Sequence, residues 1–260
     1  MKRMVLLVVL ASVAVTAMSS DEDTIVREVL DRLYDGYDRA NACWVARSAD
    51  DPGRADCLTI DRVDRVDADT GSRLYVLLTG RAFDPRTGEN IDSHVTRGLV
   101  GAPVIGFGPD GVELIAGEPR LSSGGWGVAP TDWSLIKLAP SDYWGWVNRD
   151  GYLGQGILVE SYSILAPHGR RIRDLGPIHA SWSNVGACGE AGDICPVTDI
   201  DSTLEVDSIN IGATVFPLRI TLTGQLDGRQ LTPKTWDVPF DQTSWSYVEP
   251  DDWPLAELDD

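Results

Sequence analysis

The sequence predicts a mainly β protein, an antiparallel β-sandwich-like domain preceded by one amphipathic α-helix. Apolar residues fall at helical spacing from residue 20 to about residue 44. From Leu58 onward they alternate with polar residues at a period of two. Turn residues recur at short intervals in this second region, as in antiparallel proteins built from many short strands. We therefore expect an N-terminal helix within 20–47, a β-rich domain over 48–250 and an acidic, frayed tail over 251–260.

Residues 1–19 are typical of a cleavable bacterial secretory signal peptide. Lys2 and Arg3 precede an apolar run that ends near Val15, and small residues follow. Cleavage after Ala17 and cleavage after Ser19 both fit this pattern, and an uncleaved N-terminal anchor is the alternative. The run is shorter than the roughly 18 apolar residues expected of a spanning helix, and no later stretch is long enough. We expect a periplasmic or secreted bacterial protein without a membrane span after cleavage.

The four cysteines favour disulfides over a metal site, since their number is even and the chain is predicted to reach an oxidising compartment. Of three possible pairings, the simplest joins Cys43 to Cys57 and Cys188 to Cys195, because each pair then closes a short loop. Neither C-x-x-C nor H-x-x-x-H spacing occurs, so we expect no zinc site.

The expected helix has an acidic first turn, which suits the positive end of the helix dipole. Ser20, followed three positions later by Asp23, can cap it. The spacing leaves its end open between Gly36 and Cys43. We expect it to pack on the sheet that follows, because an acidic polar face disfavours a membrane surface. Its apolar stripe is Ile25, Val26, Val29, Leu30, Leu33, Tyr34 and Tyr37.

The strands are predicted from alternation and from the turns between them. Asp227-Gly228 and Pro109-Asp110-Gly111 both suit tight hairpins, since Asp-Gly tolerates positive φ. The loop-like span 181–199 could divide the β-rich domain, although one continuous sandwich is the simpler expectation. The expected strands are 58–66, 74–83, 104–107, 112–115, 133–138, 157–165, 203–211, 216–222 and 230–240.

The chain is strongly acidic, with 40 acidic and 22 basic residues and a formal net charge of −18. Such a charge repels nucleic acid and anionic membrane surfaces, so we expect neither as a partner. The acidic residues are spread along the chain, which is typical of a solvated surface.

Two short motifs match catalytic or cofactor patterns in sequence but not in their predicted structural context. The glycines of 106–111 have the dinucleotide spacing, but they lie in a predicted hairpin and not at the start of a helix. Ser134 and Lys137 have the spacing found in penicillin-recognising enzymes, but they lie in a predicted strand and the companion motifs do not occur. We expect no cofactor.

A secreted hydrolase is the alternative function, with a site assembled from distant loops. His94, His168 and His179 could each serve as a base, although no G-x-S-x-G elbow accompanies them. Residues 67–71 and 148–151 place oxygen ligands two apart, but both lack the glutamate that completes a calcium loop. We interpret them as turns and expect no metal.

The most distinctive feature is a cluster of aromatic residues in a glycine-rich segment. Exposed aromatic faces could stack on sugar rings or anchor a protein partner, whereas buried ones would fill the core between two sheets. Trp144 and Trp146 should share one strand face. The candidate ligand-binding residues are Trp126, Trp133, Tyr143, Trp144, Trp146 and Tyr152.

These observations predict an exported, disulfide-stabilised binding or cell-envelope-associated module without catalysis, whose partner is a glycan or a protein. A weaker alternative is assembly through an exposed sheet edge.

Overall fold

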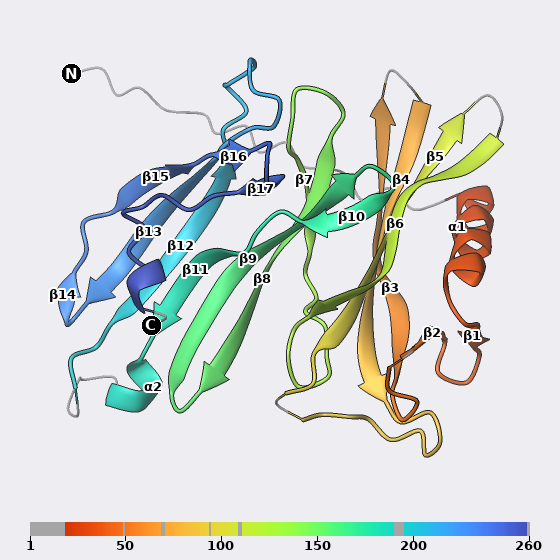
Figure 1. The fold of residues 1–260 in the computed structure, drawn as a ribbon, viewed down its shortest axis with the longest axis horizontal. Coiled ribbons are helices and arrows are strands. Elements are labelled where there is room, and N and C mark those ends of the chain that lie inside the picture. Colours follow the sequence, from red (N-terminus) through yellow and green to blue (C-terminus); the bar gives the residue numbers. More distant parts are fainter. Residues whose placement is uncertain are drawn as a thin grey trace.

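The computed structural model describes residues 19–48, 50–68, 71–93, 95–108, 111–189 and 195–258 (Figure 1). The predicted signal peptide therefore lies almost wholly outside the described residues. The protein is mainly β, with two large antiparallel sheets and one long helix near the N-terminus. This confirms the predicted fold class. No helix in the described ranges is both long and apolar enough to cross a membrane.

Helix α1 spans Ser20–Leu33, and its cap lies one residue before the predicted cap, Ser20. Ser19 is its N-cap, and Ser19 and Glu22 form a reciprocal capping box. Val26, Val29 and Leu30 are buried against the first sheet. The dipole-compatible acidic turn is present as expected.

The helix ends at Leu33, near Gly36, the earlier of its two predicted ends, and does not continue to Cys43 or residue 47. Gly36 has a φ of +145°, which side-chain-bearing residues rarely adopt, and the chain then enters two short strands. These are β1 (Tyr37–Asp38) and β2 (Cys43–Arg47). The pairing of Trp44 with Leu58 on the next strand explains why sheet is preferred here over helix.

The first sheet contains strands β1 to β6 in sequence order, each antiparallel to the next. The long strands are β3 (Ala55–Ala68), β4 (Gly71–Phe83), β5 (Gly98–Gly108) and β6 (Gly111–Ser123). Gly108 pairs with Gly111, so the glycine motif forms a hairpin, as predicted, and opens no helix. One face of this sheet packs against α1 and the other packs against the second sheet.

The second sheet has the order β14-β13-β12-β11-β9-β8-β7, with β10 paired to β9 and β15 to β13. A separate hairpin, β16 with β17, lies near the C-terminus, and a single turn, Ala256–Leu258, follows it. The bounds are β7 (Ser134–Lys137), β8 (Trp144–Gly154), β9 (Ile157–His168), β10 (Arg171–Asp174), β11 (Ile178–Ser183), β12 (Asp199–Val206), β13 (Leu218–Leu226), β14 (Arg229–Gln230), β15 (Lys234–Val238), β16 (Phe240–Asp241) and β17 (Ser246–Tyr247).

The predicted strand over 203–211 ends early, at Val206. Asn210 donates its backbone N–H to the carbonyl of Asp207, which closes a turn and leaves Ile209 and Ile211 exposed on a loop. Alternation continues through this loop, but no neighbouring strand pairs with it among the described residues. The apolar side chains therefore have no core to enter.

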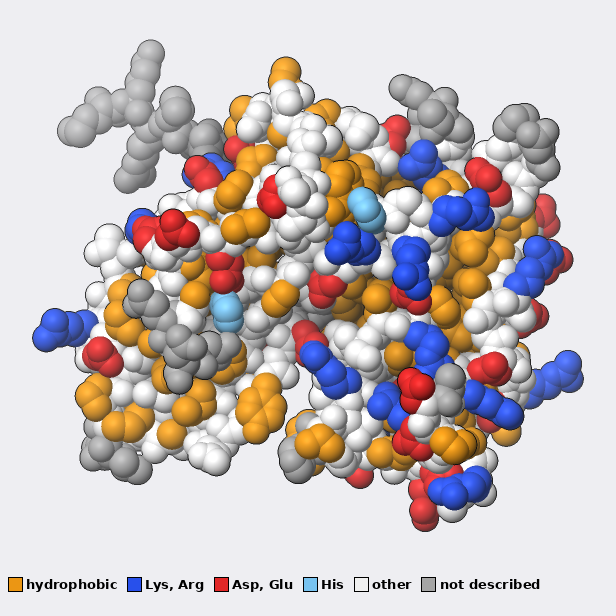
Figure 2. Space-filling model, in the orientation of Figure 1, with side chains coloured by type: hydrophobic (Ala, Val, Ile, Leu, Met, Phe, Trp, Pro, Cys, Tyr) orange, Lys and Arg blue, Asp and Glu red, His pale blue; other side chains and the backbone are white. Residues whose placement is uncertain are grey.

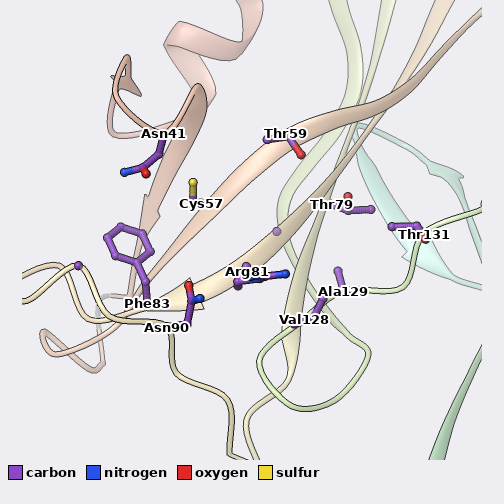
Figure 3. A pocket seen from close by; sticks show the side chains of 12 residues that line it. Asn41, Cys57, Thr59, Thr79, Arg81, Phe83, Asn90, Val128, Ala129 and Thr131 are labelled. Carbon is purple, nitrogen blue, oxygen red and sulfur yellow. The ribbon is translucent and has the colours of Figure 1, made fainter.

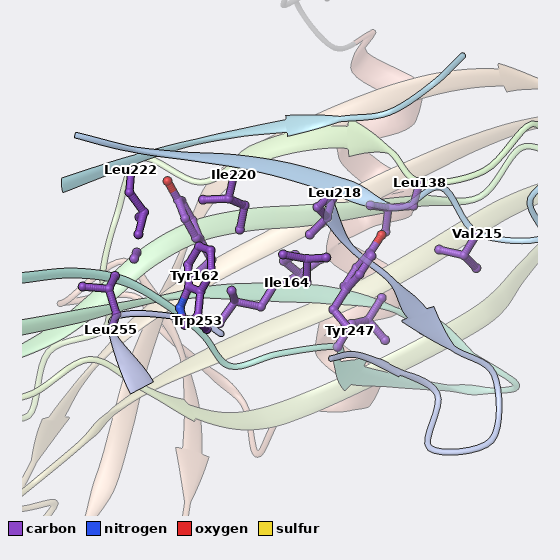
Figure 4. Close-up of a cluster of buried hydrophobic side chains, with 14 of the residues drawn as sticks. Leu138, Tyr162, Ile164, Val215, Leu218, Ile220, Leu222, Tyr247, Trp253 and Leu255 are labelled. Carbon is purple, nitrogen blue, oxygen red and sulfur yellow. The ribbon is translucent and has the colours of Figure 1, made fainter. Parts of the chain in front are cut away.

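Three clusters of buried side chains hold the layers together. One lies under α1, one lies between the two sheets, and one covers the outer face of the second sheet (Figure 4). Trp253 and Leu255 are buried in the third cluster, so the prediction of a frayed tail is wrong as far as residue 258. These two apolar side chains outweigh the acidic character of the segment.

Both predicted local disulfides are present. Cys43–Cys57 links β2 to β3, and Cys188–Cys195 ties the short helix α2 (Val185–Cys188) to the segment before β12. The span 181–199 connects β11 and β12, which are neighbours in one sheet. Whether the parts before and after it fold separately stays a prediction.

Candidate functional site

The structure distributes the six predicted aromatic residues over different surroundings. Trp133 and Trp146 are completely enclosed between the sheets, and Trp144 packs against the same cluster. Tyr143 is half-buried at the other core, where its ring makes an edge contact with Trp245. Four of the six therefore contribute to packing.

Only Trp126 and Tyr152 present large apolar surface to solvent, with 57% and 59% of each residue exposed. Trp126 lies in the connection between β6 and β7, and Tyr152 lies near the end of β8. A ligand-binding role for the aromatic segment can involve these two residues directly, and that role stays a prediction.

A groove of about 660 Å³ extends the interface between the two sheets outward to solvent. Figure 2 shows the molecule notched between its two halves at the lower edge of the view. Strands β8 and β9 supply one wall, and the end of β6 with the segment after it supplies the other. The lining residues are Arg97, Ser122, Ser123, Gly124, Gly125, Asp150, Gly151, Tyr152, Val159, Ser161, Tyr162, Ser163, Asp174 and Pro177.

Alternation along β8 explains how this groove arises. Trp146, Asn148, Asp150 and Tyr152 lie on one face of the strand, because successive residues of a strand point to opposite faces. The row begins in the buried core at Trp146 and ends at the exposed Tyr152. The change from apolar to polar side chains marks where the two sheets stop packing and the groove begins.

Asp150 ties the two walls of the groove together. Its Oδ2 atom accepts hydrogen bonds from the backbone N–H of Gly124 at 2.6 Å and the hydroxyl of Ser123 at 3.1 Å. The Nη2 atom of Arg97 lies 3.4 Å from the same oxygen. The other oxygen, Oδ1, accepts no hydrogen bond from the described residues, so it can accept one from a ligand.

Hydroxyl groups line both walls of the groove, Ser161 and Ser163 from β9 and Ser122 from β6. Ser163 donates to the carboxylate of Asp174 at 2.7 Å, whereas the hydroxyls of Ser161 and Ser122 have no protein partner within the described ranges. Tyr162 lines the groove, but its phenol donates to the carbonyl of Ser202 in the buried layer behind it. Burial raises the pKa of this phenol, which keeps it a neutral donor.

The hairpin that carries Tyr152 is held firmly at its tip. Gln155 and Gly156 turn the chain at positive φ, and a Cβ at Gly156 would come within 2.5 Å of the backbone of Ala187 in α2. The Cys188–Cys195 disulfide anchors that short helix. Tyr152 is thus exposed at an edge of the groove whose hairpin is held in place by α2.

The residues considered for hydrolysis lie elsewhere. The ring of His168 stacks near Trp245, with centroids 4.7 Å apart, and His179 Nδ1 lies 2.9 Å from Glu249 Oε1. Neither histidine lines the groove, and His94 falls outside the described residues. Ser134 and Lys137 lie on strand β7, as predicted.

The two expected turns with oxygen ligands differ from each other. Residues 148–151 form part of strand β8, so interpreting them as a turn is wrong; Asp150 belongs to the groove instead. In the other motif, Asp67 pairs with Ser72 at the end of the β3–β4 hairpin, and the residues at its tip are not described. Within the described ranges no cluster of three or more acidic, histidine or cysteine residues is placed to hold a metal ion.

Asp150 and Arg97 were not among the predicted site residues. Asp150 could have been found from its position in the alternating row that begins at Trp146, had 148–151 been recognised as strand. For Arg97 the sequence offers no such signal, because its place depends on where β5 begins relative to β8.

No protein-family model, no curated protein and no solved structure matches this chain.

Proposed function

We propose that this protein is an exported, non-catalytic binding module that holds a glycan in the groove between its two sheets. One observation carries the proposal. A single face of β8 runs from the buried Trp146 past the carboxylate of Asp150 to the exposed ring of Tyr152. A saccharide needs this combination, because its hydroxyls require donors and acceptors while its C–H faces stack on aromatic rings.

The groove offers both kinds of contact. Among the described residues, the hydroxyls of Ser122 and Ser161 have no hydrogen-bond partner and Asp150 has an unused acceptor, while Arg97 supplies donors. The volume of about 660 Å³ lies within the range of small-ligand sites. Because the groove is open and polar, it suits a hydrated ligand better than an apolar one.

Two disulfides support export, since such bonds persist in oxidising compartments. We therefore propose a periplasmic or secreted bacterial location. The spread of acidic charge supports the view that nucleic acid is not a partner.

A glycan array followed by calorimetry with the selected oligosaccharide tests the proposal. We expect Tyr152→Ala to weaken binding about tenfold or more, since stacking surface and water exclusion are lost together. Leu153→Ala is the matched control: Leu153 is 63% exposed, next in sequence and on the opposite face of β8. Its affinity should equal that of the wild type.

Equal losses in both variants, or selection of no glycan, would contradict the proposal. If the groove instead binds a purified protein, the ligand belongs to the other expected class and the glycan proposal is wrong. Shortening of the bound oligosaccharide by the wild-type protein would support the alternative, a secreted hydrolase.

A further inference from the structure

A second hollow lies on the first sheet, on the same face of β4 as the core residues Tyr75 and Leu77. Thr79 and Arg81 continue that row, and Thr59 and Cys57 pair with them on β3. The hollow has a volume of about 360 Å³ (Figure 3). Its lining consists of Asn41, Cys57, Thr59, Thr79, Gly80, Arg81, Phe83, Gly88, Asn90, Val128, Ala129 and Thr131.

The pocket contains one cationic side chain, that of Arg81. In the part of the chain that the structure describes, its guanidinium makes no hydrogen bond and no ion pair, although Arg97 beside the groove is paired with Asp150. Figure 3 shows the Arg81 side chain lying across the hollow between Asn90 and Thr79. A guanidinium presents a planar fork of donors that matches a carboxylate or a phosphate.

Uncharged polar side chains line the same hollow as this guanidinium. The side chains of Thr59, Thr79 and Asn90 also have no hydrogen-bond partner among the described residues, and all three line the hollow. Phe83 and Val128 add an apolar surface. The hollow thus combines one cation, several neutral donors and an apolar wall.

The local charge is opposite to that of the whole protein. The chain has a formal net charge of −18, yet the lining of this hollow contains no aspartate and no glutamate. Asp92 borders a smaller adjoining hollow together with Arg81, but it forms no ion pair with that guanidinium in the described part of the chain. A negatively charged ligand would meet Arg81 without a competing carboxylate in the pocket.

We propose that the Arg81 pocket binds the carboxylate of a small organic acid, with the apolar part of the ligand against Phe83 and Val128. A single arginine balances one negative charge, which favours a monoanion over a phosphate that carries nearly two. The negative net charge of the whole protein also disfavours more highly charged anions. The pocket is separate from the glycan groove, since no residue lines both.

Benzoate is a suitable probe, and its binding can be followed by nuclear magnetic resonance of the isotope-labelled protein. We expect saturable shifts of the Arg81 Nε–H and Asn90 amide resonances. Arg81→Gln should weaken binding about tenfold or more, because the charge-assisted pair is lost. Arg229→Gln is the matched control, since Arg229 is an exposed arginine on β14 without an ion pair in the described ranges. Its affinity should not change.

Three comparisons make the test decisive. Benzamide has the same ring without the charge, so equal affinity for benzamide and benzoate would overturn the proposal. Tighter binding of inorganic phosphate than of benzoate would overturn the choice of a monocarboxylate. Absence of any shift with benzoate, or equal affinity in Arg81→Gln with an otherwise unchanged spectrum, would overturn the site. Tyr152→Ala should leave benzoate binding unchanged, so failure of the glycan proposal and failure of the Arg81 proposal can be distinguished.

Discussion

The ring of Tyr152 occupies the space that a side chain at Gly154 would need. Both residues lie on the same face of β8, and a Cβ at position 154 would come within 2.3 Å of Tyr152 Oη and 2.5 Å of its Cζ. Because glycine has no side chain, the phenol can lie along the strand at the edge of the groove. The orientation of this aromatic residue therefore depends on a neighbour two positions away.

Gly154→Ala should displace the Tyr152 ring and weaken glycan binding nearly as much as Tyr152→Ala does. Gly154 does not have a positive φ, so alanine is compatible with its backbone. The double variant should bind no more weakly than Tyr152→Ala alone, since both changes remove one interaction. Calorimetry on the three variants measures this. Additive losses would show that Gly154 acts on the groove by another route.

Trp146→Ala should lower the free energy of unfolding by about 3–5 kcal/mol, because it leaves a large cavity in the core between the sheets. Trp126→Ala should change it by less than about 0.5 kcal/mol, since that residue is mostly exposed. Trp144→Ala should fall between the two, because Trp144 packs against the same core but is only partly buried. Urea denaturation of the three variants tests this order. A marginal effect of Trp146→Ala would contradict its burial.

The N-cap of α1 favours one of the two possible signal-peptidase sites. Cleavage after Ala17 would keep Ser19, whereas cleavage after Ser19 would remove the residue that forms the capping box with Glu22. Loss of such a cap costs about 1 kcal/mol. Cleavage after Ser19 would also place the positively charged α-amino group at the positive end of the helix dipole, which is unfavourable. We expect intact-mass analysis of the exported protein to show a chain that begins at Met18 with no free thiol. A full-length mass, or thiols that react before reduction, would argue against export.

Replacing both cysteines of one disulfide by alanine should cost about 3 kcal/mol for Cys43–Cys57 and about 2 kcal/mol for Cys188–Cys195 in the chain-entropy model, because the first loop is longer. The sequence separations are 14 and 7 residues. Thermal melts of the two double variants provide the comparison. The second pair should also reduce glycan affinity, since it anchors α2 against the hairpin of Tyr152. If glycan affinity is unchanged in this double variant, α2 does not support the groove.

Alkaline pH should weaken the fold partly through Tyr143. Burial raises the pKa of its phenol from the ordinary value of 10 to about 12. The folded state therefore prefers the neutral phenol. Its contribution is fully present below pH 10 and is lost as the pH rises to about 12. Tyr143→Phe should flatten the fall in unfolding free energy over this interval. Parallel curves for wild type and Tyr143→Phe would contradict the prediction.

Much of the first sheet could be predicted from the sequence because its long strands pair with their immediate neighbours. The β5–β6 hairpin is an example: alternation on both sides of the Pro109-Asp110-Gly111 sequence is sufficient to place it. The end of the helix stayed open between Gly36 and Cys43 because Tyr37 continues its apolar stripe. The conformation of Gly36 and the pairing of Trp44 select the earlier end.

The candidate site could be predicted only in part. Composition identified the aromatic segment, but it could not separate Trp146, which fills the core, from Tyr152, six residues later on the same face of one strand. Their difference arises where the first sheet stops covering β8. That limit depends on contacts between elements distant in sequence, such as Gly124 with Asp150, which periodicity does not encode.

The burial of Trp253 and Leu255 has a consequence for biogenesis. Both side chains complete the core on the outer face of the second sheet, yet they belong to the last ten residues of the chain. Until the segment that carries them docks, Tyr162, Ile164 and Ile220 keep an open apolar face, and a transiently exposed face of this kind favours aggregation.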